Sequence, residues 1–191
     1  LLYFEAERWR RIQVPGGYTF WDLHVAIQDS MGWQDRHLHV FRLIRKGYRK
    51  TVSIGIPTEE TAKYVMPDWE VPLSERLDEP GAEMIYEYDF GDGWEHKVLL
   101  EAVMLKEEGA VYPKCVGGER ACPPEDCGGP PGYEELLEIL GDPDDERHGE
   151  YMEWLSGIAK DNRPFDPERF DPAGVVFDNP KKRWRAAFER Y

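Results

Sequence analysis

All three cysteines of this chain lie in one segment rich in glycine and proline, which runs from Tyr112 to Pro130. Glycine and proline are the strongest interrupters of regular secondary structure, so this segment is predicted to be an irregular loop rather than a helix or strand. A loop that gathers every thiol of the chain needs something to hold its shape. A bound metal ion is the first candidate.

Intervals of six and four residues separate the thiols of Cys115, Cys122 and Cys127. Zinc prefers four tetrahedral ligands and binds thiolates well, so the three cysteines need one further donor. We expect His148 as the fourth ligand, because an intervening helix could return it to the loop; the alternatives are His96 and Asp126. The spacing is looser than that of paired C-x2-C knuckles, so three free cysteines packed under the loop are the competing interpretation.

Composition places the chain among globular proteins. It has 191 residues, of which 41% are hydrophobic, and a chain of this size can bury a core without support from disulfides or metal ions. We expect one domain over residues 1–191, with a sheet-rich part at 1–105 and the cysteine loop and helices at 106–191. The formal net charge of −14 disfavours a protein that coats duplex nucleic acid. No run approaches the roughly 20 apolar residues of a membrane span, and an odd number of cysteines fits a reducing cytoplasm.

The first half is predicted to hold most of the strands and one well-marked helix. Thr19 followed by Asp22 has the pattern of a capping box, and Gly32 is a natural helix stop. Between them the apolar residues Phe20, Leu23, Ile27 and Met31 share one helical face. Strands are predicted at 10–14, 38–44, 48–54, 82–90 and 94–103, with a short helix at 73–77.

The strand at 82–90 alternates regularly, with Met84, Tyr86, Tyr88 and Phe90 on one face. Asp92-Gly93 is a strong hairpin signal and predicts a two-residue turn into the next strand.

Helices are predicted at 133–140 and 150–158, and a last one from Asn179-Pro180. Strands early and helices late indicate an α+β fold, with a curled mixed sheet of the α/β roll type packed on the first helix and a mostly helical C-terminal part. The predicted core includes Leu23, Ile27, Trp33, Phe41 and Leu99.

Acidic residues and one histidine crowd the predicted hairpin: Asp89, Asp92, Glu95 and His96. With a two-residue turn, Asp89 would lie opposite His96 on one face of the sheet. A carboxylate beside an imidazole is the arrangement of an acid/base pair, and carboxylates at this density also suit a divalent ion. The favoured interpretation is structural, since cross-strand polar pairs commonly stabilise sheets.

Two further groups have a structural and a functional interpretation. His24, His37 and His39 could line a pocket with Trp33, although most such histidines are satisfied core residues. Basic residues gather in two clusters, one at Arg42, Arg45, Lys46, Arg49 and Lys50, and one at Lys181, Lys182, Arg183 and Arg185 beside Trp184. Arginine with aromatic residues can bind single-stranded nucleic acid, but such clusters are more often solvated faces or intramolecular partners.

Several ordered blocks carry a resemblance to a known family. They are Trp9-Arg10-Arg11-Ile12-Gln13-Val14-Pro15, Asp22-Leu23-His24, His37-Leu38-His39-Val40-Phe41, Tyr86-Glu87-Tyr88-Asp89-Phe90-Gly91-Asp92-Gly93-Trp94-Glu95-His96, Pro123-Pro124-Glu125-Asp126-Cys127-Gly128-Gly129, and the region from Phe165 to Phe170. Together they resemble the plasmid Ri ORF-three-like family, also known as transposon-passenger resolvase-like proteins. The resemblance implies an α/β roll and an association with plasmids and mobile elements. It implies no particular reaction, and the chain has no clear serine-recombinase nucleophile motif with its arginine cluster.

The favoured function is that of a non-catalytic binding or interaction module of mobile elements, cytoplasmic, with a structural zinc ion and a protein or nucleic-acid partner. Two alternatives stay open. One is a metal-dependent hydrolase or nuclease acting at Asp89, Asp92 and His96. The other is a small nucleic-acid-binding protein that uses Arg42, Arg45, Lys46 and Arg49.

Overall fold

The structure, a computed structural model, describes residues 8–43, 52–158 and 164–189. Its strands are β1 (Trp9–Gln13), β2 (His39–Leu43), β3 (Val52–Gly55), β4 (Val65–Pro67), β5 (Glu83–Tyr88), β6 (Trp94–Leu99) and β7 (Lys114–Glu119). Its α-helices are α1 (Phe20–Met31), α2 (Gly129–Gly141), α3 (His148–Ile158) and α4 (Pro180–Phe188), and short 3-10 turns lie at Leu73–Glu75 and Pro172–Gly174. None of the helices in the described ranges combines the length and the apolar character that crossing a bilayer requires.

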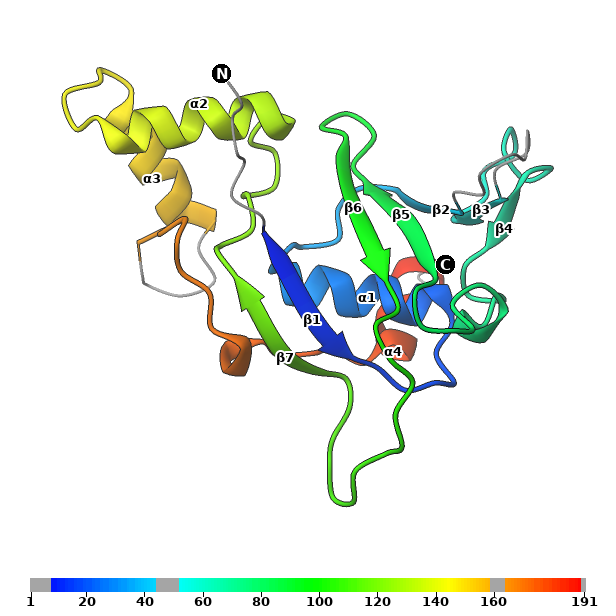
Figure 1. Ribbon diagram of the computed structural model, residues 1–191. Helices are drawn as coiled ribbons and strands as arrows, with labels where there is room; N and C mark the ends of the chain where they lie inside the picture. Colours follow the sequence, from blue (N-terminus) through cyan, green and yellow to red (C-terminus); the bar gives the residue numbers. More distant parts are fainter. Residues whose placement is uncertain (1–7, 44–51, 159–163, 190–191) are drawn as a thin grey trace.

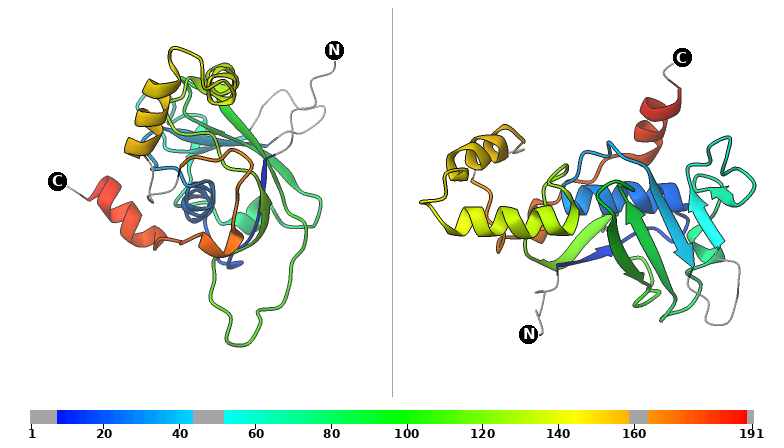
Figure 2. Two further views of the ribbon diagram at one scale, coloured as in Figure 1. Left: turned by 90° about the vertical axis from the view of Figure 1, so that its left-hand side faces the viewer. Right: turned by 90° about the horizontal axis from the view of Figure 1, so that it is seen from above.

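The described strands form two sheets around α1 (Figure 1). Five strands pair in the order β4-β3-β2-β5-β6, and only the β3–β4 pair is parallel. β1 pairs separately with β7 in an antiparallel ribbon. The α+β class is therefore confirmed, and the described strands form two sheets in place of the single sheet that was predicted. Helix α1 lies among the strands, and α4 packs beside α1 (Figure 2).

Helix α1 forms as its sequence predicts. Thr19 accepts a hydrogen bond from the backbone N–H of Asp22, and the Asp22 carboxylate accepts one from the backbone N–H of Thr19. Gly32 ends the helix at φ 81°, a left-handed conformation that glycine adopts without strain. The helix packs its apolar face into the core with Phe20, Leu23 and Ile27 all buried.

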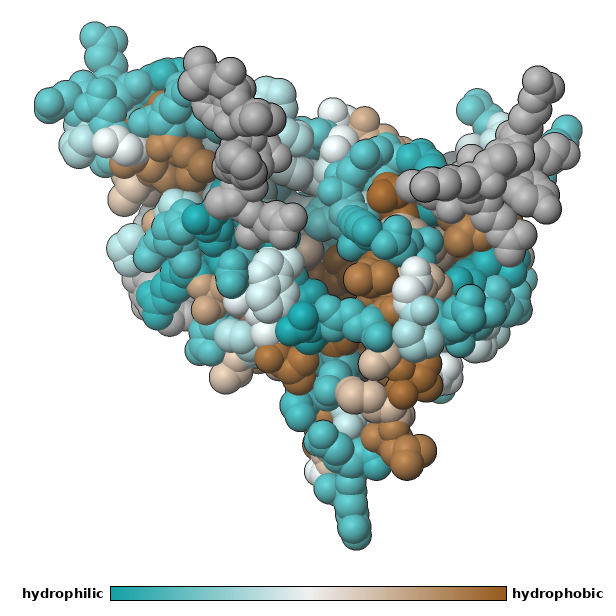
Figure 3. Space-filling view, viewed as in Figure 1, coloured by the Kyte–Doolittle hydropathy of each residue, from teal (hydrophilic) through white to brown (hydrophobic). Residues whose placement is uncertain are grey.

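The core confirms four of the five predicted residues and corrects one. Leu23, Ile27, Trp33 and Phe41 are buried. Leu99 is 44% exposed, because β6 ends there instead of continuing to residue 103. The chain then enters the long projecting loop 100–113, which carries exposed apolar side chains at Val103, Met104, Leu105 and Val111 (Figures 1 and 3).

The hairpin register differs from the prediction. Tyr88 pairs with Trp94 and Tyr86 pairs with His96, so the connecting turn has the five residues 89–93. Asp89 adopts φ 56° and its carbonyl accepts from the N–H of Gly93, which ends β5 at Tyr88, two residues before the predicted end at Phe90. Phe90 consequently lies in the turn, 51% exposed, and does not share the face of Tyr86 and Tyr88.

Candidate functional site

Three segments that are far apart in the sequence meet beside the C-terminal end of α1. They are residues 33–37 after α1, the turn 89–93, and residues 121–129 ahead of α2. The Trp33 indole N–H donates to the carbonyl of Pro123 over 2.9 Å, and the Gln34 backbone N–H donates to the Glu125 carboxylate over 2.7 Å. We call this region the three-loop junction.

Gly129 shows how closely the third segment approaches the turn. A Cβ atom at this position would lie 2.4 Å from the carbonyl oxygen of Asp92, and the residue has φ 69°. Both features require glycine, because no side chain fits there and the backbone is left-handed. The glycines after Cys127 thus permit backbone contact between the two loops.

Glu125 is the central buried carboxylate of the three-loop junction. It is 9% exposed, and its second oxygen accepts a short hydrogen bond from the Tyr88 hydroxyl. That hydroxyl in turn accepts from the Arg36 backbone N–H over 3.0 Å. Burial and the neighbouring Glu125 carboxylate raise the pKa of Tyr88, so the hydroxyl remains a protonated donor.

Glu125→Ala is expected to lower the free energy of unfolding by about 1–3 kcal/mol, since it leaves the Tyr88 hydroxyl and the Gln34 N–H without their acceptor. Urea denaturation followed by tryptophan fluorescence measures this loss. Glu134→Ala, at an exposed position of α2, is the matched control and should stay within about 0.5 kcal/mol. Equal losses in the two variants would show that the Glu125 bonds do not hold the junction.

A cleft of about 680 Å³ opens beside the three-loop junction. It lies between the end of α1, residues 121–126, α3 and residues 164–176. Aromatic residues from three of these elements line it, namely Trp33, Trp154, Phe165 and Phe170, together with the basic residues Arg36 and Arg169.

The charged groups of the cleft differ in whether they have partners. Each acidic side chain in its wall accepts a hydrogen bond from within the protein: Asp29, Glu125, Asp126, Asp166 and Asp171. Arg10 donates to the carbonyls of Ser30, Trp9, Glu119 and Arg120. The Arg36 and Arg169 side chains are exposed and have no hydrogen-bond or ion-pair partner among the described residues. Within the described ranges, the cleft therefore offers two cations, Arg36 and Arg169, that no internal group neutralises.

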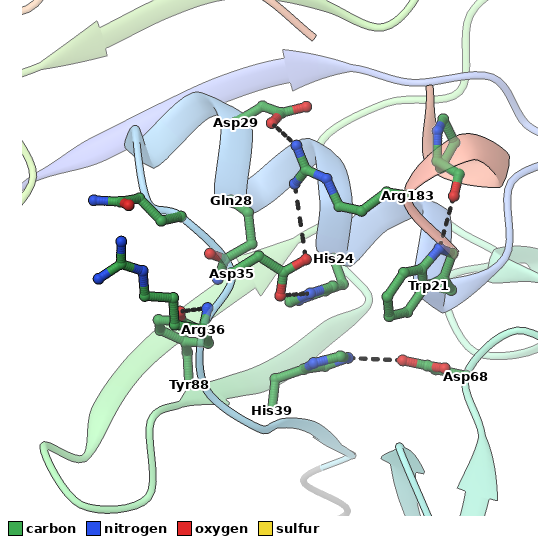
Figure 4. Close-up of polar contacts among 12 residues, drawn as sticks. Trp21, His24, Gln28, Asp29, Asp35, Arg36, His39, Asp68, Tyr88 and Arg183 are labelled. Atoms are coloured by element: carbon green, nitrogen blue, oxygen red, sulfur yellow. Dashed lines mark hydrogen bonds and ion pairs between the residues drawn. The ribbon is translucent and has the colours of Figure 1, made fainter. Parts of the chain in front are cut away.

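A network of two histidines and two carboxylates joins α1 to the strands (Figure 4). The His24 and His39 rings stack with centroids 3.5 Å apart. His24 Nε2 contacts Asp35 over 2.8 Å, and His39 Nε2 contacts Asp68 over 2.7 Å. His24 Nδ1 lies 2.8 Å from the Tyr86 hydroxyl, which completes the bonding of its ring.

Burial, and the neighbouring His39, lower the pKa of His24 to about 4. The ring is therefore neutral near pH 7, and its side chain is fully buried. This network ties α1 to β2, β5 and the end of β4, which fits the structural interpretation of His24 and His39. His37, the third of the predicted group, lies apart from them at the three-loop junction.

Helix α4 covers the outer side of this network. Arg183 lies 2.7 Å from Asp29 and 3.8 Å from Asp35, and the Trp21 indole N–H donates to the carbonyl of Pro180 (Figure 4). Arg185 pairs with Glu189 on the same helix. The arginines of the C-terminal basic cluster thus serve as intramolecular partners.

Of the predicted basic cluster at residues 42–50, only Arg42 lies within the described part of the chain. Arg42 pairs with Glu87 across the β2–β5 ladder. Arg45, Lys46, Arg49 and Lys50 lie outside the described residues.

The structure does not assemble the predicted hairpin site. Since His96 lies opposite Tyr86, Asp89 is not its cross-strand neighbour. The His96 ring instead meets Trp33 edge-on at 5.3 Å, and burial lowers the pKa of His96 to about 4. Asp89 faces a different histidine, His37, because the five-residue turn points it toward the first loop. The prediction of an Asp89–His96 pair was wrong.

The cysteine segment is more regular than predicted. Residues 114–119 form strand β7, where Gly117 and Gly118 let Trp9 and Phe170 pack closely on the backbone. All three cysteines are free, and burial raises the pKa of Cys122 and Cys127 to about 12. Among the described residues, the set whose ligand atoms lie within 4.8 Å of one another is His37, Asp89 and Asp126, and it includes neither a cysteine nor His148. Zinc at the cysteines stays a prediction that this geometry does not support.

Sequence reasoning did not identify the cleft or the two arginines, Arg36 and Arg169, that line it. Arg36 and Arg169 are isolated basic residues more than a hundred positions apart, and they share a wall only after residues 164–176 fold back on α1. The signals that could have indicated it are the family blocks around Glu125 and around Phe165 to Phe170.

Comparison with known proteins identifies the family. The profile described as "Plasmid pRiA4b ORF-3-like protein" matches residues 1–174. The chain belongs to the plasmid pRiA4b ORF-3-like family. A relative of this pRiA4b ORF-3-like protein, the uncharacterized protein y4hQ of Sinorhizobium fredii (strain NBRC 101917 / NGR234), is 39% identical over 154 residues, which cover 80% of this chain and 76% of y4hQ.

The fold of this pRiA4b ORF-3-like protein also has a solved relative. The crystal structure of the protein of unknown function MM3350 from Methanosarcina mazei Go1 matches with a TM-score of 0.77 and 42% identity, over 92% of this chain and 93% of MM3350. The resemblance inferred from the sequence blocks is thereby confirmed. Neither relative's description names a ligand or a reaction, so function has to be argued from the site.

Proposed function

We propose that this member of the pRiA4b ORF-3-like family is a non-catalytic binding module, and that its cleft takes a small organic anion with an aromatic or apolar part. The observation that carries the proposal is the difference in pairing. The acidic groups of the cleft wall are bonded within the protein, whereas Arg36 and Arg169 have no partner among the described residues.

The size and lining of the cleft favour a small molecule. A volume of about 680 Å³ lies in the range of small-molecule sites, roughly 300–1,000 Å³. Trp154 and Phe165 offer apolar ring surface, and a guanidinium group pairs with a carboxylate or phosphate through parallel hydrogen bonds. A ligand with one anionic group and one apolar body would use both features.

The charge of the chain favours a small anion over a polyanion. With a formal net charge of −14, the protein as a whole repels a nucleic-acid duplex, whereas a compact anion can pair directly with Arg36 or Arg169.

The cleft also lacks an activated nucleophile among its thiols. Cys122 lines it, but burial raises the pKa of Cys122 to about 12, so the sulfur is a neutral thiol near pH 7. The carboxylates are engaged as hydrogen-bond acceptors for backbone and side-chain donors. These features support binding rather than catalysis.

The test compares two probes that differ only in charge, 2-naphthoate and 2-naphthamide. Their affinities for the full chain are measured by titration of tryptophan fluorescence or by ligand-observed NMR. We expect 2-naphthoate to bind more than ten-fold tighter, and the double variant Arg36→Gln/Arg169→Gln to remove this preference. Arg185→Gln, an exposed arginine on α4, is the matched control and should keep it. Equal affinity of the two probes for the wild-type protein, or the same loss in the control variant, would contradict the proposal.

A further inference from the structure

We infer that His37, Asp89 and Asp126 form a binding site for one divalent transition-metal ion at the three-loop junction. One ligand atom from each residue lies within 4.8 Å of the others. His37 Nε2 is 3.0 Å from Asp126 Oδ1, and His37 Nδ1 is 3.5 Å from Asp89 Oδ2. Each residue comes from a different loop, so an ion at this point would tie the three loops together.

The three ligand atoms lie close enough to approach one ion, although the two carboxylates now face different ring nitrogens of His37 and one ion takes only one of these nitrogens. Metal bonds of about 2.0–2.2 Å place neighbouring ligand atoms roughly 3.0–3.5 Å apart in octahedral or tetrahedral geometry. The side chain of Asp126 is 55% exposed, which leaves it free to adjust to the ion. Binding of one ion requires both carboxylates to gather at the same nitrogen of His37, and the exposed Asp126 side chain is the one able to turn toward it.

The buried carboxylate of Asp89 is the independent observation that points to a cation. Asp89 is 8% exposed, and its Oδ1 accepts from the backbone N–H groups of Gly91 and Asp92. Its Oδ2 faces His37 and has no hydrogen bond from any described residue. In the same turn, Asp92 Oδ2 is buried without a hydrogen-bond partner.

Charge at the three-loop junction is also unbalanced. Asp89 and Asp126 lie beside a single imidazole, that of His37, and no lysine or arginine among the described residues forms an ion pair with either carboxylate. Carboxylates held this close without a cation repel one another, so a divalent ion would relieve the repulsion as well as fill the vacant oxygen positions.

The donor set selects the class of ion. Two carboxylate oxygens favour Mg²⁺, Ca²⁺ or Mn²⁺, and an imidazole nitrogen favours Zn²⁺ and its neighbours, so Mn²⁺ and Zn²⁺ suit the mixed set best. Three protein ligands leave further coordination positions open. Asp126 also borders the cleft, so an exogenous anion could reach them. The metal site does not rest on the proposed function, because metal uptake is measured without any cleft ligand.

The experiment uses full-length protein freed of metal with a chelator and titrated with Mn²⁺ at pH 7, with the free aqua ion followed by electron paramagnetic resonance. We expect one Mn²⁺ per chain and competition by Zn²⁺. Asp126→Asn and His37→Gln should each weaken Mn²⁺ binding more than ten-fold, with far-UV circular dichroism unchanged. Asp144→Asn, an exposed acid between α2 and α3, and Cys122→Ser should bind Mn²⁺ like the wild-type protein.

Three results would overturn the inference. They are Mn²⁺ binding by the wild-type protein no tighter than by the Asp126→Asn variant, equal losses in Asp144→Asn and Asp126→Asn, and loss of the ion in Cys122→Ser alone. The last would assign the metal to the cysteines. None of these results affects the arginine test of the cleft, so either proposal can be contradicted while the other stands.

Discussion

Phe41→Ala is expected to lower the free energy of unfolding by about 3–5 kcal/mol, the range found when a large buried aromatic side chain is truncated. Phe41 lies on β2 and is 0% exposed. Its ring packs edge-on against Phe20 of α1, with centroids 5.1 Å apart, and at a tilt against Tyr86 of β5, with centroids 4.8 Å apart. Removing it opens a cavity where the helix meets the centre of the five-stranded sheet. Urea denaturation monitored by far-UV circular dichroism measures the loss.

The matched control for this prediction is Leu105→Ala. Leu105 is 95% exposed on the projecting loop, so its truncation should change the free energy of unfolding by less than about 0.5 kcal/mol. If Phe41→Ala costs as little as Leu105→Ala, α1 does not pack on the sheet in solution as it does in the structure.

Acidification from pH 7 to pH 4.5 is expected to lower the free energy of unfolding by about 2–3 kcal/mol through His24 alone. Burial lowers the pKa of His24 in the folded chain to about 4, against an ordinary value of 6.5. Between these two values the unfolded chain takes up a proton that the folded chain does not, so stability falls as pH falls. Below about pH 4 both states are protonated, and this contribution changes no further.

The contribution of His24 is isolated by comparison with His24→Gln in urea denaturation at the two pH values. The variant should be less stable than the wild-type protein at pH 7, because it loses the contacts to Asp35 and Tyr86. Its further loss at pH 4.5 should be smaller by about 2–3 kcal/mol, since the proton uptake by His24 is absent from the variant. Identical pH dependence in the two proteins would mean that His24 is not buried in its neutral form.

Local signals in the sequence predicted the elements whose ends are set by neighbouring residues. Helix α1 begins and ends where Thr19, Asp22 and Gly32 indicate, because capping is decided within one helical turn. Alternation placed Met84, Tyr86 and Tyr88 on the buried face of β5. These features need no knowledge of the rest of the chain.

The predictions that were wrong concern features set by tertiary structure and not by neighbouring residues in the sequence. Strand β7 forms in a glycine-rich segment because β1 offers it a partner more than a hundred residues away, and pairing overrides a poor local propensity. The turn 89–93 takes five residues because the left-handed backbone of Asp89 ends the ladder early, although Asp92-Gly93 looks locally like a two-residue turn.

The candidate site was predicted only in part, for the same reason. His37, Asp89 and Asp126 were each singled out in the sequence, but in three different groups. Their meeting depends on how residues 121–129 dock on the end of α1, through Trp33, Gln34 and Glu125. No spacing in the sequence encodes that contact directly.

The most direct test of the central claim, that the cleft binds a small organic anion, is chemical-shift mapping of 2-naphthoate on isotope-labelled full-length protein. The account predicts that the perturbed amide signals cluster at residues 33–37, 121–126 and 164–176, and that they return to their unbound positions in the Arg36→Gln/Arg169→Gln variant. Perturbations centred instead on α4 or on the projecting loop 100–113, or unchanged in that variant, would contradict it.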